Sequence, residues 1–170
     1  MRCLFHYLLV RPMNARLIKQ FRFEAAHRLT CVGETHPCGR MHGHSYRIEL
    51  TLEGAVDPQT GWLIDFGELE QAWLPVKCRL DHAVLNELPD LENPTCENLT
   101  RWIWNELVGA LPMLKRVTLW ETSDARCEYE GEKSSSQISS LRDASSEFAS
   151  SQIQSPEAPS SEIPSTQNST

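Results

Sequence analysis

The sequence predicts an α+β domain in which an antiparallel sheet of four strands carries two helices on one face. Near the start of the domain and again near its end, apolar residues alternate with polar ones, which is typical of strands with one buried face. Between these regions, apolar residues recur at the three- and four-residue spacing of helices. The predicted order is therefore strand, strand, helix, helix, strand, strand, which favours a sheet with its helices on one side.

The first two strands are predicted over residues 21–29 and 42–54. In each strand the residues of one parity are apolar or histidine, while those of the other parity are mostly polar. The inward-facing sets are Phe21, Phe23, Ala25, His27 and Leu29 in the first strand and His42, His44, Tyr46, Ile48, Leu50 and Leu52 in the second. The connection over residues 30–41 contains two glycines and a proline and is predicted to be a loop.

Two helices are predicted next. Asp65 is expected to cap the first helix, and Pro75, which lies inside the helical pattern, should shorten or kink it. The second helix is expected to begin after Pro94 and Thr95 and to end near residues 109–112. The apolar positions are Leu69, Ala72, Trp73 and Val76 in the first helix and Leu99, Trp102, Ile103 and Leu107 in the second.

The last two strands are predicted over residues 117–122 and 127–130, paired as a short hairpin. Glu121 shares its face with Val117 and Leu119, where the pattern calls for an apolar residue. A buried carboxylate needs a partner. Two interpretations are open at this point, a salt bridge to an arginine or an anchor for the N–H donors of a ligand.

Length and charge limit the kinds of protein that this chain can be. Its 170 residues, 40% of them hydrophobic, suit one globular domain, and the formal net charge of −7 argues against a nucleic-acid partner and for small-molecule chemistry. The folded domain is predicted over residues 14–132, after an N-terminal extension of residues 1–13. Residues 133–170 contain 14 serines in 38 positions and are predicted to form a disordered tail.

The cysteines and apolar runs predict a cytoplasmic protein without a membrane partner. Six cysteines are scattered along the chain without a Cys-x-x-Cys pair, which favours reduced thiols over a disulfide scaffold. An apolar run of eight residues, Cys3–Val10, is short for a signal peptide and is not followed by a small-x-small cleavage pattern. No stretch approaches the ~20 apolar residues that a membrane span needs.

Three histidines form a candidate metal site. The parity of the first two strands places His27, His42 and His44 on the covered face of the sheet, and His42 and His44 are two residues apart on one strand. If the strands pair, three neutral imidazoles converge, which is a ligand set of catalytic zinc with its fourth position open. Zinc is preferred to iron because no carboxylate completes a facial triad within this cluster.

Cys38 is separated from His42 by three residues and lies in the loop with His36 and Arg40. Neighbouring positive charge favours the thiolate, so Cys38 is a candidate base or nucleophile, although a free cysteine can also be a small buried hydrophobe.

Asp81 and His82 are adjacent, and a carboxylate beside an imidazole can tune proton transfer. A surface turn is the alternative interpretation of that pair.

Taken together, these segments resemble the 6-pyruvoyltetrahydropterin synthase family, and within it the branch of queuosine biosynthesis. The resemblance covers essentially all of residues 17–132, and the spacing between Cys38 and the His-Gly-His pair is like that of the queuosine branch. The matching segments are residues 23–29 (FEAAHRL), 38–44 (CGRMHGH), 60–66 (TGWLIDF), 80–82 (LDH) with 85–86 (LN), 92–95 (ENPT) and 121–122 (ET).

The resemblance implies a role for each candidate residue. It implies that His27, His42 and His44 bind Zn²⁺ and that Cys38 accepts the substrate proton. It also implies that Asp81 and His82 form a relay with Cys38. Glu121 would hold the pterin ring and join this charge relay.

The resemblance also implies the fold, the assembly and the reaction. The family has the tunnelling fold (T-fold), in which the sheets of several subunits join into barrels with the active sites between subunits, usually in a homohexamer. The implied reaction is a carbon–carbon lyase reaction that converts 7,8-dihydroneopterin triphosphate to 6-carboxy-5,6,7,8-tetrahydropterin with release of acetaldehyde and triphosphate. Two alternatives are kept: a synthase that only eliminates triphosphate, and a non-catalytic module in which zinc, with Cys38 as fourth ligand, ties the strands together.

Overall fold

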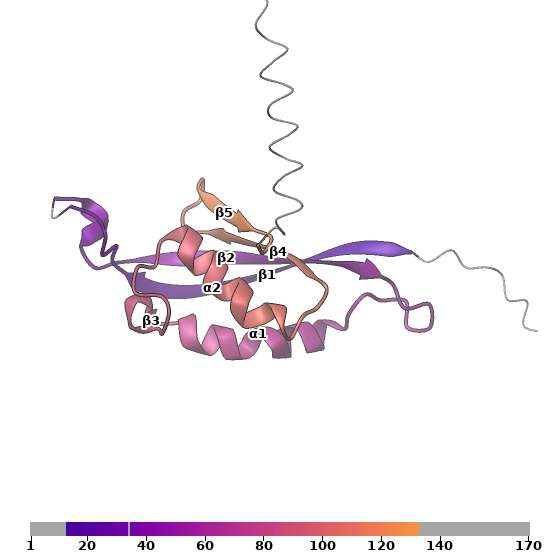
Figure 1. Cartoon of the computed structure of the whole chain (residues 1–170). Coiled ribbons are helices and arrows are strands. Elements are labelled where there is room, and N and C mark those ends of the chain that lie inside the picture. Colours follow the sequence, from indigo (N-terminus) through magenta and orange to yellow (C-terminus); the bar gives the residue numbers. More distant parts are fainter. Residues whose placement is uncertain (1–12, 34, 133–170) are drawn as a thin grey trace, which may run out of the picture. The chain divides into compact units, whose positions relative to one another are not determined.

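The computed structural model describes residues 13–33 and 35–132, which form a twisted sheet with helices on one face (Figure 1). The two long strands β1 (Asn14–His27) and β2 (His42–Ala55) pair antiparallel along their whole length, from Asn14 opposite Ala55 to His27 opposite His42. β4 (Leu114–Trp120) pairs antiparallel with β2, and β5 (Arg126–Tyr129) pairs with β4. The predicted α+β fold is confirmed.

The sheet has five strands rather than the predicted four, and it is mixed rather than fully antiparallel. The additional strand, β3 (Ala83–Val84), pairs parallel with Ala25 and Ala26 of β1, which gives the order β3-β1-β2-β4-β5. Two residues are too few for a period-two pattern, so the sequence did not indicate this strand. β1 also begins at Asn14 rather than at residue 21. The sequence did not indicate the first half of this strand, because its inward residues are only partly buried and its apolar and polar positions alternate weakly.

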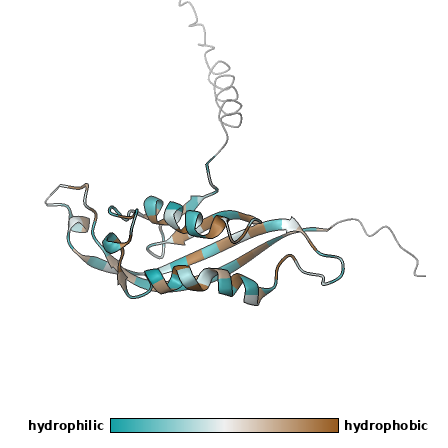
Figure 2. Cartoon of the chain, turned by 60° about the horizontal axis from the view of Figure 1, so that its bottom comes forward, coloured by the Kyte–Doolittle hydropathy of each residue, from teal (hydrophilic) through white to brown (hydrophobic). Residues whose placement is uncertain are grey.

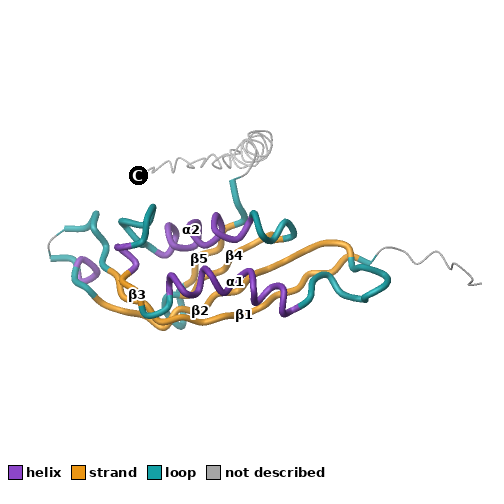
Figure 3. The backbone as a smooth tube through the Cα atoms, turned by 90° about the horizontal axis from the view of Figure 1, so that it is seen from below, coloured by secondary structure: helices purple, strands orange, loops and turns teal. Residues whose placement is uncertain are grey.

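Both helices lie along the same face of the sheet (Figure 3). α1 (Phe66–Leu80) begins as predicted after Asp65, whose side chain accepts hydrogen bonds from the backbone N–H groups of Gly67 and Glu68. Of the two effects expected of Pro75, shortening is contradicted, because α1 continues to Leu80, while a kink at Pro75 stays a prediction. α2 (Cys96–Val108) begins after Thr95, as predicted, and the Thr95 side chain caps the Asn98 N–H.

The core lies between the sheet and the two helices. In Figure 2 both helices carry hydrophilic as well as hydrophobic residues, as expected of helices with one buried side. The sequence patterns identified the inward residues correctly, since each of the following is buried: Phe23, Ala25, Tyr46, Ile48, Leu50 and Leu52 from the strands, Leu69, Trp73 and Val76 from α1, and Leu99, Trp102, Ile103 and Leu107 from α2. This packing fixes the facing ends of β1 and β2, where the candidate histidines lie.

The predicted N-terminal extension, except for Met13, and the predicted disordered tail lie outside the described residues. Within residues 13–33 and 35–132, no helix combines the length and apolar character needed to cross a membrane.

Candidate active site

Three imidazoles converge where β1 ends and β2 begins. His27 is the last residue of β1 and lies opposite His42, the first residue of β2, while His44 follows two residues later on the same face. One ring nitrogen from each of the three lies within 4.8 Å of the others. The convergence predicted from strand parity is therefore confirmed.

Backbone carbonyls determine which nitrogens of His27 and His42 are available. The Nδ1 of His27 lies 2.8 Å from the Pro94 carbonyl oxygen, and the Nδ1 of His42 lies 2.8 Å from that of Arg40. Each Nδ1–H therefore donates to a carbonyl, which in the neutral ring leaves the lone pair on Nε2. The two Nε2 atoms are 3.1 Å apart. Two lone pairs at this distance repel each other unless a cation or a proton lies between them.

His44 completes a donor set that fits a metal ion. Its Nε2 is buried and has no hydrogen-bond partner among the described residues. A buried ring nitrogen without a partner beside two other imidazoles is costly, and binding of a cation would remove that cost. A tetrahedral zinc with Zn–N bonds of about 2.0–2.1 Å would separate its ligand atoms by roughly 3.3 Å, close to the observed His27–His42 spacing. The Nδ1–H bonds to carbonyls are the outer contacts that metal-binding histidines usually make.

Glu121 comes from the end of β4 and reaches the same cluster. Arg47 of β2 pairs with Trp120, the last residue of β4, and Glu121, which follows the strand, lies beside Tyr46. The Glu121 Oε1 lies 3.2 Å from the Nε2 of His27 and 3.5 Å from that of His44, and it accepts a hydrogen bond of 3.5 Å from the Tyr46 hydroxyl. Among the described residues, Glu121 forms no salt bridge to an arginine, so that alternative interpretation is not supported.

This carboxylate bears on the predicted choice of metal. Glu121 lies within hydrogen-bonding distance of a predicted metal ligand, so the cluster does have a carboxylate nearby. The three histidines alone still make up the group of converging ligand atoms. The preference for zinc over iron therefore stays a prediction, while a metal site of three imidazoles is what the geometry supports.

The charges of the cluster are coupled. The hydrogen bond from His27, together with the charges of all three histidines, lowers the pKa of Glu121 despite its burial. Burial opposes the charged form of His27, but Glu121 and the Pro94 carbonyl outweigh it, so the pKa of His27 is raised in the metal-free chain. Burial lowers the pKa of His44. Glu121 is consequently an anion near neutral pH.

A cavity of about 370 Å³ lies beside the cluster. This cavity, which we call the triad cavity, brings Cys38 together with the three histidines and Glu121. Cys38 is half-buried in a short 3-10 helix, Pro37–Gly39, and its backbone N–H donates to the Nδ1 of His36. The other lining residues are Leu29, Thr95, Cys96, Glu97 and Thr122.

A second thiol lines the triad cavity, that of Cys96. Burial, with a smaller contribution from Glu121, raises the pKa of Cys96 to about 12. Its sulfur lies 3.7 Å from the Leu119 carbonyl oxygen. Cys96 is therefore a protonated thiol at neutral pH, which makes it a poor base or nucleophile.

Within one chain, Asp81 and His82 are not brought to the triad cavity. Asp81 ends α1 and accepts a hydrogen bond of 2.9 Å from the Glu24 backbone N–H, which lowers its pKa. His82 has a positive φ of 60° and a side chain that is 79% exposed. It lines another cavity, with Glu24, Ser45 and β3, whose lining shares only His44 with the triad cavity. The ring of His82 lies 3.2 Å from the Asp81 carboxylate.

Sequence reasoning missed three groups at the site. Tyr46 contacts Glu121, and the carbonyls of Pro94 and Arg40 orient the histidines. Tyr46 had a signal, because it follows His44 by two residues on the same face. The carbonyls had none, since a backbone acceptor carries no side-chain identity.

Comparison with known proteins agrees with this fold. The family model for 6-pyruvoyl tetrahydropterin synthase matches residues 16–132, so the chain belongs to this family of pterin synthases. The predicted resemblance to the family is confirmed. A solved relative is the 6-pyruvoyl tetrahydropterin synthase of Caenorhabditis elegans, with a TM-score of 0.67 and 25% identity over 72% of this chain and 99% of that chain.

Curated relatives of the chain carry three different names. A 6-carboxy-5,6,7,8-tetrahydropterin synthase of Synechocystis is 36% identical over 119 residues, 66% of this chain and 91% of that protein. A dihydroneopterin monophosphate aldolase of Pyrococcus furiosus is 35% identical over 121 residues, 69% and 99% of the two chains. The human 6-pyruvoyl tetrahydrobiopterin synthase is 29% identical over 140 residues, 72% and 95%. The branch that the sequence resembles is thus represented among these relatives.

Proposed function

We propose that the chain is a zinc-dependent 6-carboxy-5,6,7,8-tetrahydropterin synthase that acts in queuosine biosynthesis. It would convert 7,8-dihydroneopterin triphosphate and water to 6-carboxy-5,6,7,8-tetrahydropterin, acetaldehyde and triphosphate. The observation that carries the proposal is the meeting of three imidazoles with the Cys38 thiol and the Glu121 carboxylate around a single cavity. The Synechocystis relative and the spacing between Cys38 and His42 support this branch.

Glu121 is proposed to hold the pterin ring. A carboxylate can accept two parallel N–H bonds, such as those of the amino-pyrimidine edge of a pterin. The lowered pKa of Glu121 keeps it an acceptor at neutral pH. With the ring at Glu121, the side chain of the substrate extends toward the histidines and Cys38, because all of them line the same cavity.

His27, His42 and His44 are proposed to hold the zinc ion. When bound, zinc would supply Lewis-acid polarisation of the oxygens on the substrate side chain. The carbonyls of Pro94 and Arg40 hold two of the imidazoles in the tautomer that such a site needs.

Cys38 is proposed to take the carbon-bound proton from the substrate side chain. A thiolate is the form that can do this, and Cys96 is held in the thiol form by its raised pKa. The Asp81–His82 pair is proposed to act as the proton relay on Cys38. Because the pair faces a different cavity in its own chain, we propose that it acts on Cys38 of a second copy within a cytoplasmic homohexamer.

Incubation of the zinc-loaded protein with 7,8-dihydroneopterin triphosphate tests the proposal. Equal amounts of acetaldehyde and 6-carboxy-5,6,7,8-tetrahydropterin are expected. Triphosphate release without acetaldehyde would instead identify a 6-pyruvoyl tetrahydropterin synthase. Absence of turnover, together with sulfur in the first shell of the zinc, would identify the non-catalytic module.

A second substrate should be included because of the Pyrococcus relative. That protein is named for an aldolase acting on dihydroneopterin monophosphate and is 35% identical to this chain. Turnover of 7,8-dihydroneopterin monophosphate in preference to the triphosphate would contradict the proposed substrate.

A further inference from the structure

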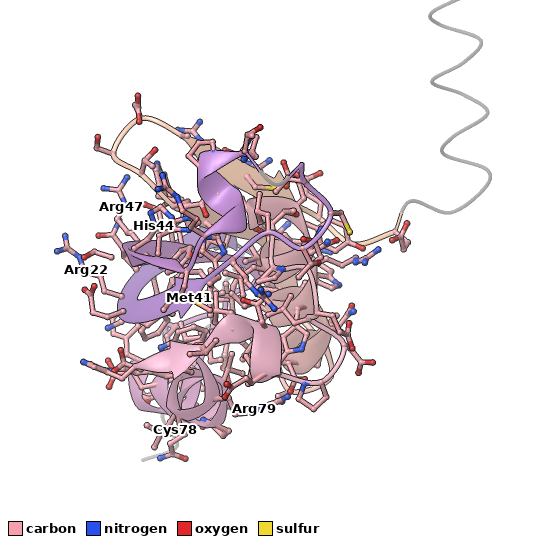
Figure 4. The ribbon with its side chains drawn as sticks, turned by 90° about the vertical axis from the view of Figure 1, so that its left-hand side faces the viewer. Arg22, Met41, His44, Arg47, Cys78 and Arg79 are labelled. Atoms are coloured by element: carbon pink, nitrogen blue, oxygen red, sulfur yellow. The ribbon has the colours of Figure 1, made fainter. Side chains whose placement is uncertain are left out.

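A second cavity adjoins the triad cavity on the far side of Cys38 and His42. It has a volume of about 470 Å³ and is lined by Pro37, Cys38, Arg40, Met41 and His42, and we call it the Arg40 cavity. Cys38 and His42 line both cavities. Figure 4 shows the end of the molecule where Met41 and His44 lie. A ligand whose reacting centre lies at Cys38 can therefore have one end in each cavity.

The two cavities differ in charge. The triad cavity carries the carboxylates of Glu97 and Glu121, whereas the described residues that line the Arg40 cavity include no carboxylate and one guanidinium. Carboxylates repel a phosphate chain, and a guanidinium attracts it. The electrostatics therefore favour the ring of an anionic ligand on the Glu121 side and its phosphates on the Arg40 side.

The guanidinium of Arg40 is available for a ligand. Among residues 13–33 and 35–132, it has no ion pair and no hydrogen bond from its side chain. Other arginines are already paired, such as Arg79 with Glu106 at 2.7 Å and Arg126 with Glu128 at 2.9 Å. An unpaired arginine beside a cavity without carboxylates is suited to phosphate, because its planar fork can donate two parallel hydrogen bonds to phosphate oxygens.

The backbone of Arg40 is held in place on both sides. Its N–H donates to the Pro37 carbonyl at 3.2 Å, and its carbonyl accepts the Nδ1–H of His42 at 2.8 Å. Arg40 lies two positions before His42, so their Cα atoms are at most about 7 Å apart. The Arg40 backbone is therefore held close to the histidine cluster. From there its guanidinium can reach a group on a ligand that is bound at the cluster.

We propose that Arg40 binds the phosphate chain of the pterin substrate in the Arg40 cavity. As a substrate site this rests on the proposed function, whereas the anion site itself rests only on the cavity and the unpaired guanidinium. Arg40 then determines specificity for phosphorylated over unphosphorylated pterins. Its backbone carbonyl separately orients His42.

The test compares Arg40→Gln with a matched control, Arg22→Gln, in the zinc-loaded full chain. For the binding measurements every protein, the wild-type sequence at positions 22 and 40 included, also carries Cys38→Ala, so that the triphosphate is not turned over. Arg22 is exposed and lies on the sheet face away from α1 (Figure 4), so its substitution makes the same charge change elsewhere. Calorimetry measures Kd for 7,8-dihydroneopterin, its monophosphate and its triphosphate. Zinc content is measured in parallel, because a purely structural role of Arg40 through His42 would change it.

The wild-type affinity is expected to increase with the number of phosphates and to weaken with salt. Arg40→Gln should weaken triphosphate binding about 10- to 100-fold, with the unphosphorylated pterin and the zinc content unaffected. Arg22→Gln should behave like the wild type, and Arg40→Lys should recover part of the loss as a point charge. An unchanged Kd for the triphosphate, or an equal loss for all three ligands, would overturn the inference. If Arg40→Gln does not fold, the same comparison is made with Arg40→Lys, for which a Kd equal to that of the wild type would overturn it.

Inorganic triphosphate separates this inference from the proposed function. If the wild type binds inorganic triphosphate and Arg40→Gln does not, the anion site stands even when no pterin is turned over. If 7,8-dihydroneopterin triphosphate is turned over with the same KM by Arg40→Gln and the wild type, the proposed function stands and the Arg40 site is rejected.

Discussion

The Nε2 atoms of His27 and His42 face each other at 3.1 Å, and in their neutral forms neither ring can donate to the other because each gives its Nδ1–H to a backbone carbonyl. The arrangement is stable when a cation lies between the two lone pairs. His44 adds a third buried nitrogen, which has no hydrogen-bond partner among the described residues. The carbonyls of Pro94 and Arg40 thus hold the rings of His27 and His42 in the orientation that directs Nε2 toward a metal ion.

Replacement of His27 by glutamine should abolish stoichiometric zinc binding, because it removes one of three ligands and its contact with Pro94. His36→Gln is the matched control, since His36 lies in the neighbouring loop outside the cluster. Metal analysis of the purified proteins should show about one zinc per chain in the control. Full zinc content in His27→Gln would reject His27 as a ligand.

Replacement of Cys38 by alanine should leave zinc bound and lower turnover about 10²- to 10⁴-fold, the usual contribution of a positioned base. Product formation and zinc content are measured on the same preparation. Cys78→Ala, which removes an exposed thiol on α1, should have normal turnover. The base assignment fails if Cys38→Ala retains wild-type turnover, and loss of zinc would indicate that the sulfur is a ligand.

Replacement of Glu121 by glutamine should weaken pterin binding roughly 10- to 100-fold, because a charged acceptor of N–H bonds becomes a neutral amide. Calorimetry with unphosphorylated 7,8-dihydroneopterin isolates this effect from phosphate contacts. Zinc content should remain unchanged. The comparison is Glu106→Gln on α2, whose carboxylate pairs with Arg79 away from the site. Unaltered affinity in Glu121→Gln would contradict the anchor role.

Mixed assemblies should show whether the Asp81–His82 relay acts between copies. Cys38→Ala and His82→Ala are each expected to be nearly inactive alone. When they are co-expressed with random assembly, roughly a quarter of the sites (a half times a half) should combine an intact Cys38 with an intact His82 of another copy. Activity near that fraction is the expected result. A relay within one chain predicts no recovery at all.

Much of the fold followed from local patterns. The alternation at Phe23 and Tyr46 identified the buried face of each long strand, and Asp65 and Thr95 marked the helix starts through their capping side chains. The sequence patterns did not predict the structure correctly where an element is very short, where apolar and polar positions alternate weakly, or where a proline lies inside a helix. β3 has two residues, the start of β1 is only partly buried, and α1 continues past Pro75.

The sequence by itself determined the ligand face, because side-chain parity on a strand is a local property that places His27, His42 and His44 on one side. Only the tertiary structure decided what meets them there. Strand register brings Glu121 to His27 across 94 positions of sequence (121 − 27), and the Pro94 carbonyl fixes the tautomer of the same ring. It also separates the Asp81–His82 pair from Cys38 within one chain. Such contacts depend on which strands pair and in what register, and no local pattern contains that information.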